Sequence, residues 1–186
     1  MRLNLMNRYV KIILFVALAA VLTVPSAVNA QDVATGSATA TVLTALAVSS
    51  AAALVFGNVY QGVTATIANI NAAAGIYAIT GQGSAGIAIY MALPDYVALA
   101  DGSDRMTIAF SSTDASVDSL GGADPTGMVA GAGWQDINPH SFPSATVIGS
   151  GGTTNIYLGG KITPTIDQTA GAYTGDVVLT VAYNGT

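Results

Sequence analysis

Alternation of apolar residues with polar or small ones is the feature that most narrows what this chain can fold into. The segments 86–93, 105–110 and 176–183 each place an apolar side chain at every second position. A period of two puts these side chains on one face of an extended strand, whereas a helix repeats its buried positions every three or four residues. Each segment is therefore predicted to be a half-buried β-strand. In the last segment the aligned residues are Val177, Leu179, Val181 and Tyr183.

Further strands are expected between turns rich in Gly, Pro, Asp and Ser. Lys, Arg and Glu, which populate exposed helix faces, are scarce in the chain, while Thr, Val and Gly are frequent. About nine short strands at intervals of roughly ten residues are typical of an antiparallel β-sandwich. The sequence therefore predicts an all-β fold. The remaining predicted strands are 37–49, 53–59, 62–70, 75–80, 144–149 and 154–163.

Residues 1–30 have the pattern of a secretory signal peptide. Basic residues come first, then an apolar run, and then small residues at Ala27 and Ala30, as signal peptidase cleavage requires. The apolar run is shorter than the roughly 20 residues of a comfortable membrane span, and no later run matches it. We therefore expect cleavage after Ala30 and export. Residues 31–186 are expected to form a single β-sandwich domain with no membrane span.

The charge of the exported part excludes one large class of partners. The full chain carries 5 basic and 10 acidic residues, and all the acidic ones are Asp. Loss of the signal peptide leaves only Arg105 and Lys161 as basic residues, for a net charge of about −8. An acidic surface repels phosphate backbones, so no nucleic acid is expected as a partner. The chain has no Cys, which excludes disulfides and thiol chemistry.

The hexapeptide GQGSAG at 81–86 matches the G-x-G-x-x-G spacing of dinucleotide-binding loops. Such a loop needs a strand before it and a helix N-terminus after it. Here a predicted strand stands on each side, so no helix N-terminus is available to face a phosphate. The three glycines are instead predicted to form the turn of a β-hairpin with positive φ angles, and no cofactor is expected.

No residue pattern for catalysis or metal binding stands out. His140, the one histidine, has no G-x-S-x-G nucleophile motif to accompany it. The Asp residues between 95 and 124 lack the D-x-D-x-D-G spacing of a calcium loop, so they are expected in solvated turns. No catalytic residue, metal site or enzymatic activity is predicted. Aromatic residues that would stack on sugars, although core packing is their commoner use, are Tyr90, Tyr96, Trp134, Tyr157 and Tyr173.

Both ends of the exported chain resemble a known kind of surface protein. Residues 156–184 read as a strand, a Gly-Gly step, a second strand, a turn and an alternating strand, like the close of fimbrial subunits. Residues 38–59 resemble their opening strand and the element that follows it, here Leu54, Phe56, Gly57 and Val59. The chain is thus similar to a family of exported, fimbria-like domains of Gram-negative bacteria. The resemblance implies an immunoglobulin-like, pilin-like antiparallel β-sandwich without enzymatic activity.

The same resemblance implies assembly into a homopolymer. Related pilins exchange an N-terminal strand that completes the sheet of the next subunit. Only residues 184–186 follow the last predicted strand, so its edge is expected to be open. Residues 31–49 are the candidate donor, or else residues 38–49 are the first strand of their own domain, and the sequence leaves both open. The candidate contact residues are Ala38, Ala40, Val42, Leu46 and Val48 in this segment and Val177, Leu179, Val181 and Tyr183 in the last strand.

These expectations favour a structural subunit of a bacterial surface filament, a fimbria or pilus assembled by strand complementation. The resemblance further implies a periplasmic chaperone, an outer-membrane usher, and passage through the periplasm to the cell surface. The disulfide that many pilins carry is absent from this chain. One alternative stays open at this point: a secreted monomer that acts as a carbohydrate-binding or adhesive module.

Overall fold

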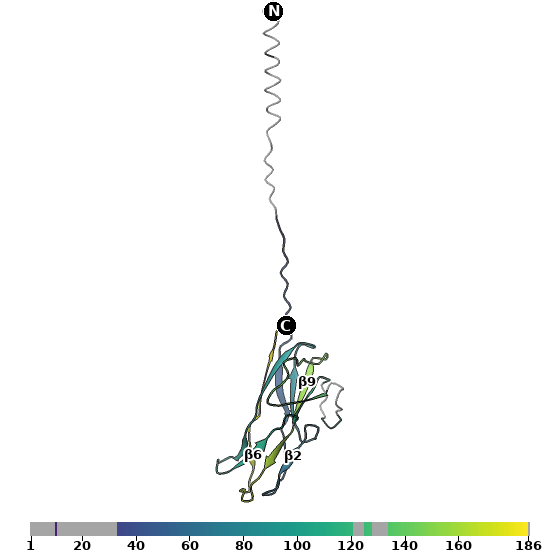
Figure 1. The fold of residues 1–186 in the computed structure, drawn as a ribbon. Helices are drawn as coiled ribbons and strands as arrows, with labels where there is room; N and C mark the ends of the chain where they lie inside the picture. The colour runs from purple at the N-terminus through teal and green to yellow at the C-terminus, as the bar shows by residue number, and fades with distance from the viewer. Residues whose placement is uncertain (1–9, 11–32, 121–124, 128–133, 186) are drawn as a thin grey trace, which may run out of the picture. The chain divides into compact units, whose positions relative to one another are not determined.

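The computed structural model describes Val10 and residues 33–120, 125–127 and 134–185. The predicted signal peptide, except for Val10, lies outside these residues. Contacts within the chain divide it into two units, Met1–Ala40 and Thr41–Thr186. Every strand of the described residues belongs to the second unit, which Figure 1 shows as a set of short strands joined by loops.

The second unit contains twelve strands and one 3₁₀ helix within the described residues. The helix, η1, is Pro125–Gly127. The strands are β1 (Ala47–Ala52), β2 (Ala65–Ile67), β3 (Gly75–Thr80), β4 (Ile87–Ala92), β5 (Tyr96–Leu99), β6 (Arg105–Ala109), β7 (Ala115–Asp118), β8 (Trp134–Ile137), β9 (Thr153–Leu158), β10 (Gly160–Thr163), β11 (Tyr173–Thr174) and β12 (Val178–Tyr183).

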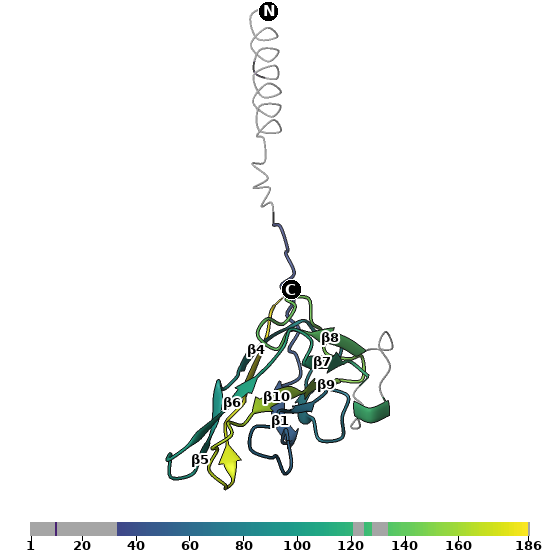
Figure 2. The same cartoon turned by 60° about the horizontal axis from the view of Figure 1, so that its bottom comes forward.

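These strands pair into two five-stranded sheets and one two-stranded ribbon. The first sheet has the order β1-β3-β9-β7-β8, the second has the order β11-β5-β6-β10-β2, and the ribbon pairs β12 with β4. All of the pairings are antiparallel. Figure 2 shows β7, β8 and β9 on one side of the domain and β4, β5 and β6 on the other. The prediction of an all-β, antiparallel protein is confirmed, and the arrangement is consistent with a β-sandwich.

Two hydrophobic clusters form the core. The larger one lies where the first sheet meets the β4–β12 ribbon, and it includes the fully buried Ile79 and Ile156. Phe110 packs against both clusters. Full burial of such a side chain is worth about 1.5–3 kcal/mol, so the clusters hold the sheets together. The smaller cluster joins β6 to β10 through Met106, Ile108 and Ile162.

Some predicted strands are shorter than expected or absent. Residues 33–46 and 53–64 belong to no strand, and 144–149 contributes only a single bridge, between Val147 and Gly86. Segment 53–64 contains two glycines with positive φ angles of 69° and 70°, a conformation that interrupts an extended strand. Segment 53–64 is therefore a loop between β1 and β2.

The Gly-Gly step at 159–160 is where the chain changes sheets. β9 ends in the first sheet, and β10 begins in the second. A Cβ atom at Gly159 would lie 2.7 Å from the backbone nitrogen of Asn69 and closer still to the carbonyl oxygen of Ile67. Only glycine fits this close approach, so the predicted strand 154–163 divides into two here.

The loop at 81–86 also changes sheets, so the predicted β-hairpin is wrong. β3 pairs with β1 and β9, whereas β4 pairs with β12. The positive φ angle of the loop, 62°, belongs to Ser84 rather than to a glycine. A Cβ atom at Gly81 would lie 2.5 Å from the Tyr183 hydroxyl, and the other two glycines approach their neighbours as closely. The glycines therefore serve close packing between loop and core.

Gly159→Ala should destabilise the domain, because the added methyl group would meet backbone atoms of the neighbouring strand. We expect the free energy of unfolding to fall by about 1–3 kcal/mol, the usual cost of overpacking. Urea denaturation followed by circular dichroism measures this change. Gly151→Ala is the matched control, because a Cβ atom there meets nothing within 4 Å. Equal losses of stability in the two variants would contradict the packing argument.

Candidate functional site

The predicted contact residues of the last strand face the protein's own core. β12 pairs along its length with β4, from Val178 opposite Ala92 to Tyr183 opposite Ile87. The apolar alternation predicted for this strand is therefore present, and its apolar face points inward. The larger cluster is covered by the partly buried side chains of Val177, Leu179, Val181 and Tyr183.

The predicted contact residues of the N-terminal segment fall into two groups. Leu46 packs against the larger cluster, and Val48 lies in β1. Only residues 47–49 of the predicted strand 37–49 form a strand in their own domain, while residues 33–46 belong to none. Pairing with β3 begins only at residue 47, so residues 38–46 form no strand within their own domain. The second group of predicted contact residues is exposed and lies outside any strand, and it contains Ala38, Ala40 and Val42.

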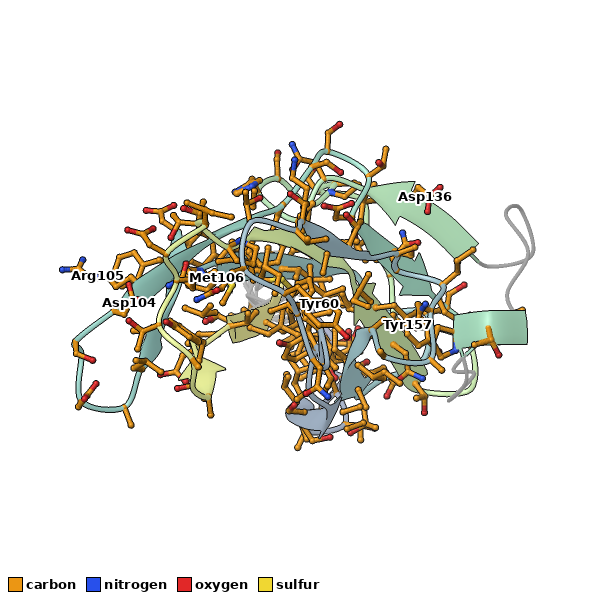
Figure 3. All side chains as sticks on the ribbon, turned by 90° about the horizontal axis from the view of Figure 1, so that it is seen from below. Tyr60, Asp104, Arg105, Met106, Asp136 and Tyr157 are labelled. Atoms are coloured by element: carbon orange, nitrogen blue, oxygen red, sulfur yellow. The ribbon has the colours of Figure 1, made fainter. Side chains whose placement is uncertain are left out.

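An open groove lies between the segment that follows β1 and the segment that precedes β12. Its volume is about 1180 Å³, with residues 53–61 as one wall and residues 168–177 as the other. In Figure 3, Met106 lies in view between Tyr60 of the first wall and Asp104 at the start of β6. The groove is lined at its bottom by apolar side chains from both sheets: Tyr77, Val97, Met106, Ile108 and Ile162.

Apolar side chains on the β1 edge and in the first wall of the groove are less buried than their neighbours in the core. Val48 stands opposite Ile79 in the β1–β3 register, so the two side chains point to the same side of the sheet. Ile79 has no exposed surface, whereas Val48 is 39% exposed. Leu54 and Phe56 of the first wall are likewise only partly buried. The apolar layer is therefore uncovered along the β1 edge.

Polar contacts join the two walls at one end of the groove. The side-chain amide nitrogen of Gln61 donates a hydrogen bond to the carbonyl oxygen of Gln168 over 2.5 Å. The backbone N–H of Gly62 donates to the carbonyl oxygen of Thr165 over 2.9 Å. The walls are thus fastened to each other at this end.

Asp104 holds the second wall in place. Its Oδ2 atom accepts hydrogen bonds from the Thr169 N–H over 2.7 Å, from the Tyr173 hydroxyl over 2.8 Å and from Nε2 of Gln168 over 2.8 Å. The hydrogen bonds from Thr169, foremost, and then from Tyr173 stabilise the carboxylate and hold the pKa of Asp104 well below its ordinary value. One carboxylate therefore links the β5–β6 hairpin to residues 168–177.

No local sequence pattern predicts the contacts of Asp104 with Gln168, Thr169 and Tyr173. Asp104 ends the turn DGSD, which is predicted to be solvated, but its partners follow 64 to 69 residues later in the chain. The turn prediction does fit Asp101, whose Oδ1 accepts hydrogen bonds from the N–H and hydroxyl of Ser103. The same local pattern thus covers one carboxylate that serves its own turn and another that holds a distant loop.

Most of the other candidate residues lie outside the groove. His140 is exposed, its Nε2 lies 3.3 Å from the carbonyl oxygen of Phe110, and the two rings meet edge to face. Tyr157 is fully buried, whereas the ring of Tyr96 lies 4.7 Å from the guanidinium carbon of Arg105. The side chain of Trp134 lies outside the described part of the structure. Among the residues that are described, no three metal-ligating side chains gather as a metal site requires.

Comparison of the chain with protein-family models, with curated proteins and with solved structures finds no match. The fimbria-like resemblance of the two chain ends therefore stays a prediction. In the part of the chain that the structure describes, no helix has the length and apolar character needed to cross a membrane.

Asp104→Asn should lower stability at neutral pH and flatten its loss in acid. The pKa of Asp104 in the folded protein is below the value of about 3.9 typical of an unfolded chain. Its contribution to stability is therefore complete above that value and is lost as the pH falls below about 4. Urea unfolding of both proteins between about pH 2 and 7 measures the difference, which should shrink toward acid pH.

Asp167→Asn, at an exposed position in the same loop, is the control for the loss of one negative charge. It should leave the pH dependence of unfolding close to that of the unchanged protein. A difference between Asp104→Asn and the unchanged protein that stays constant from neutral to acid pH would contradict the role given to Asp104.

Proposed function

We propose that this protein is a structural subunit of a bacterial surface filament, a fimbria or pilus built by strand complementation between copies. The observation that carries the proposal is the open groove between the end of β1 and the start of β12, which has apolar side chains at its bottom and both polar and apolar residues in its walls. An exposed N-terminal segment that joins no strand of its own domain supplies the matching element.

The groove meets β1 at Ser50 and reaches Val177, just before β12, so an inserted strand would lie close to both of these strands. β1 pairs with β3 and β12 pairs with β4, and among the described strands each has a partner on one side only. Unpaired N–H and C=O groups along a strand edge are a template for a further strand. An inserted strand would also cover Leu54, Phe56 and Val177. An immunoglobulin-like, pilin-like sandwich that lacks one strand has these properties, and we assign the fold to that class.

Residues 33–43 have the composition of a donor strand. They contain no charged residue and no Pro, and from residue 35 to residue 42 small apolar residues alternate with Thr and Ser. All of them are exposed. Asp176 is the one charged residue among those that line the groove. The uncharged segment 33–43 is therefore compatible in charge with the groove. In an extended chain Ala38, Ala40 and Val42 share one face, which would turn toward the groove.

Two kinds of interaction would stabilise the inserted strand. Its backbone would form hydrogen bonds with the strand edges beside the groove, which gives β-strand addition most of its affinity. Burial of Val42 would add about 1.5–3 kcal/mol, and each smaller side chain would add less. Small side chains suit this groove because Tyr77 and Met106 already fill its bottom.

Assembly at the cell surface also needs a route out of the cell. The signal peptide at 1–30 would provide export to the periplasm. Before assembly the groove exposes apolar surface, which a periplasmic chaperone would cover until an outer-membrane usher adds the subunit to the filament. No catalytic residue, metal or cofactor takes part in this function.

Removal of the donor should leave a domain that folds and does not polymerise. The test compares the mature chain, starting at Gln31, with a chain starting at Thr41, where the second unit begins. We expect filaments or oligomer ladders only from the mature chain, by electron microscopy and by size exclusion with light scattering. A peptide of residues 33–43 should bind the shortened chain and raise its melting temperature, because a ligand at 100 times its Kd stabilises by about 2.7 kcal/mol.

A matched pair of peptides tests which face of the donor enters the groove. Val42→Asp places a charge on the face proposed to be buried, and Thr41→Asp places the same charge on the opposite face. Only the first change should abolish binding. A mature chain that stays monomeric at high concentration, and whose shortened form does not bind the unchanged peptide, would overturn the proposal. Glycan binding by that monomer would then support the adhesive module.

A further inference from the structure

A small group of contacts fastens the chain just before β1 to the end of β12. The hydroxyl of Tyr183 donates a hydrogen bond to the carbonyl oxygen of Thr44 over 2.6 Å and accepts one from the N–H of Gln82 over 2.7 Å. The hydroxyl of Thr44 also donates to Oε1 of Gln82 over 3.2 Å. We call these contacts of Thr44, Gln82 and Tyr183 the clasp.

Leu46 is held beside the clasp by close packing. Its side chain packs against the larger cluster. A Cβ atom at Gly81 would lie 2.8 Å from Cδ1 of Ile148 and 3.1 Å from Cδ1 of Leu46, besides its contact with the Tyr183 hydroxyl. Gly81 therefore leaves the space that Leu46 and Tyr183 share. As a result, the chain is held at Thr44 and again at Leu46 before β1 begins.

These contacts oppose insertion of the segment into the groove of its own domain. To run antiparallel beside β1, residues 33–43 would need the chain to reverse at residues 44–46. Tight hairpin turns use Gly, Asn or Asp at positions of positive φ, and these three residues are Thr, Ala and Leu. The reversal would also move the carbonyl of Thr44 and the side chain of Leu46, which the clasp and the larger cluster hold.

Tethering makes such a barrier necessary. A segment attached to its own domain has an effective concentration in the millimolar range. The segment of a second copy, at a micromolar protein concentration, is about a thousandfold more dilute. If a segment bound its own groove and the groove of a second copy with the same intrinsic affinity, self-insertion would be favoured by about that factor. A polymer therefore requires that self-insertion be disfavoured by about a thousandfold or more.

We propose that the clasp opposes the chain reversal that self-insertion would need, so that each groove stays free for residues 33–43 of a second copy. The inference rests on the proposed function and adds to it the contacts that prevent a copy from filling its own groove. Gln82 and Tyr183 oppose self-insertion because they hold Thr44 in place. Residues 44–46 oppose it further, because none of them favours a tight turn.

The test opens the clasp and supplies a turn in the mature chain. Tyr183→Phe removes both hydrogen bonds of the hydroxyl and keeps the ring in the core. Thr44→Asn with Ala45→Gly adds the Asn-Gly pair that two-residue hairpin turns favour. We expect the triple variant to be monomeric and its groove to bind no labelled peptide of residues 33–43, while the unchanged chain polymerises. Tyr90→Phe is the matched control, because Tyr90 lies on β4 and is 66% exposed.

Each outcome separates the inference from the proposed function. A triple variant that polymerises like the unchanged chain would overturn the inference and leave the proposed function intact. An unchanged chain that is monomeric, refuses the peptide, and accepts it once shortened to Thr41 would also overturn the inference, because its own segment would be filling the groove. If the shortened chain refuses the peptide as well, the proposed function fails.

Tyr183→Phe alone decides the matter if circular dichroism shows that the triple variant does not fold. Loss of the clasp hydrogen bonds should raise the monomer fraction roughly five- to tenfold, the effect of one net hydrogen bond. Tyr90→Phe should leave the fraction unchanged. Equal monomer fractions in Tyr183→Phe and Tyr90→Phe would overturn the inference.

Discussion

Packing of apolar side chains between the first sheet and the β4–β12 ribbon is the interaction on which the rest of this domain depends. The chain has no cysteine, so no disulfide supports that layer. The layer is complete beneath β3, β7 and β9 and incomplete beside β1, where Val48 stays 39% exposed. The chain crosses between strand pairings at Gly159 and at residues 81–86, and each crossing uses glycine to bring backbone close to neighbouring atoms.

Alternation predicts the strands well where one face of a paired strand packs on the core. Ile87 and Met91 in β4, and Met106 and Ile108 in β6, are all buried as the period of two requires. The same reasoning fails for 53–59, which forms no strand, and for 144–149, which forms only the bridge between Val147 and Gly86. A period of two shows only that one side of an extended chain is apolar. Whether that chain has a hydrogen-bonded neighbour depends on residues far away in the sequence.

The candidate site could be predicted from sequence in part. The apolar residues of β12 and the uncharged N-terminal segment are visible in the pattern of residues, whereas the contacts that shape the groove are not. Asp104 meets Gln168 across 64 positions, and Tyr183 meets Thr44 across 139. Contacts made by single polar residues in loops produce no periodic pattern in the sequence from which they could be predicted. The GQGSAG motif shows the converse, since its glycines fit the approach of core and loop atoms rather than a phosphate.

The start of β1 and the end of β12 lie at the same end of the domain, next to the contact between Thr44 and Tyr183. A force that pulls the two chain ends apart would act across these strands and break their interstrand hydrogen bonds one after another. A force along a strand seated in the groove would load all of its hydrogen bonds together, because these bonds run perpendicular to the strand. If copies assemble by strand insertion, as proposed, the domain would be mechanically weak when stretched by its own termini and strong along the inserted strand.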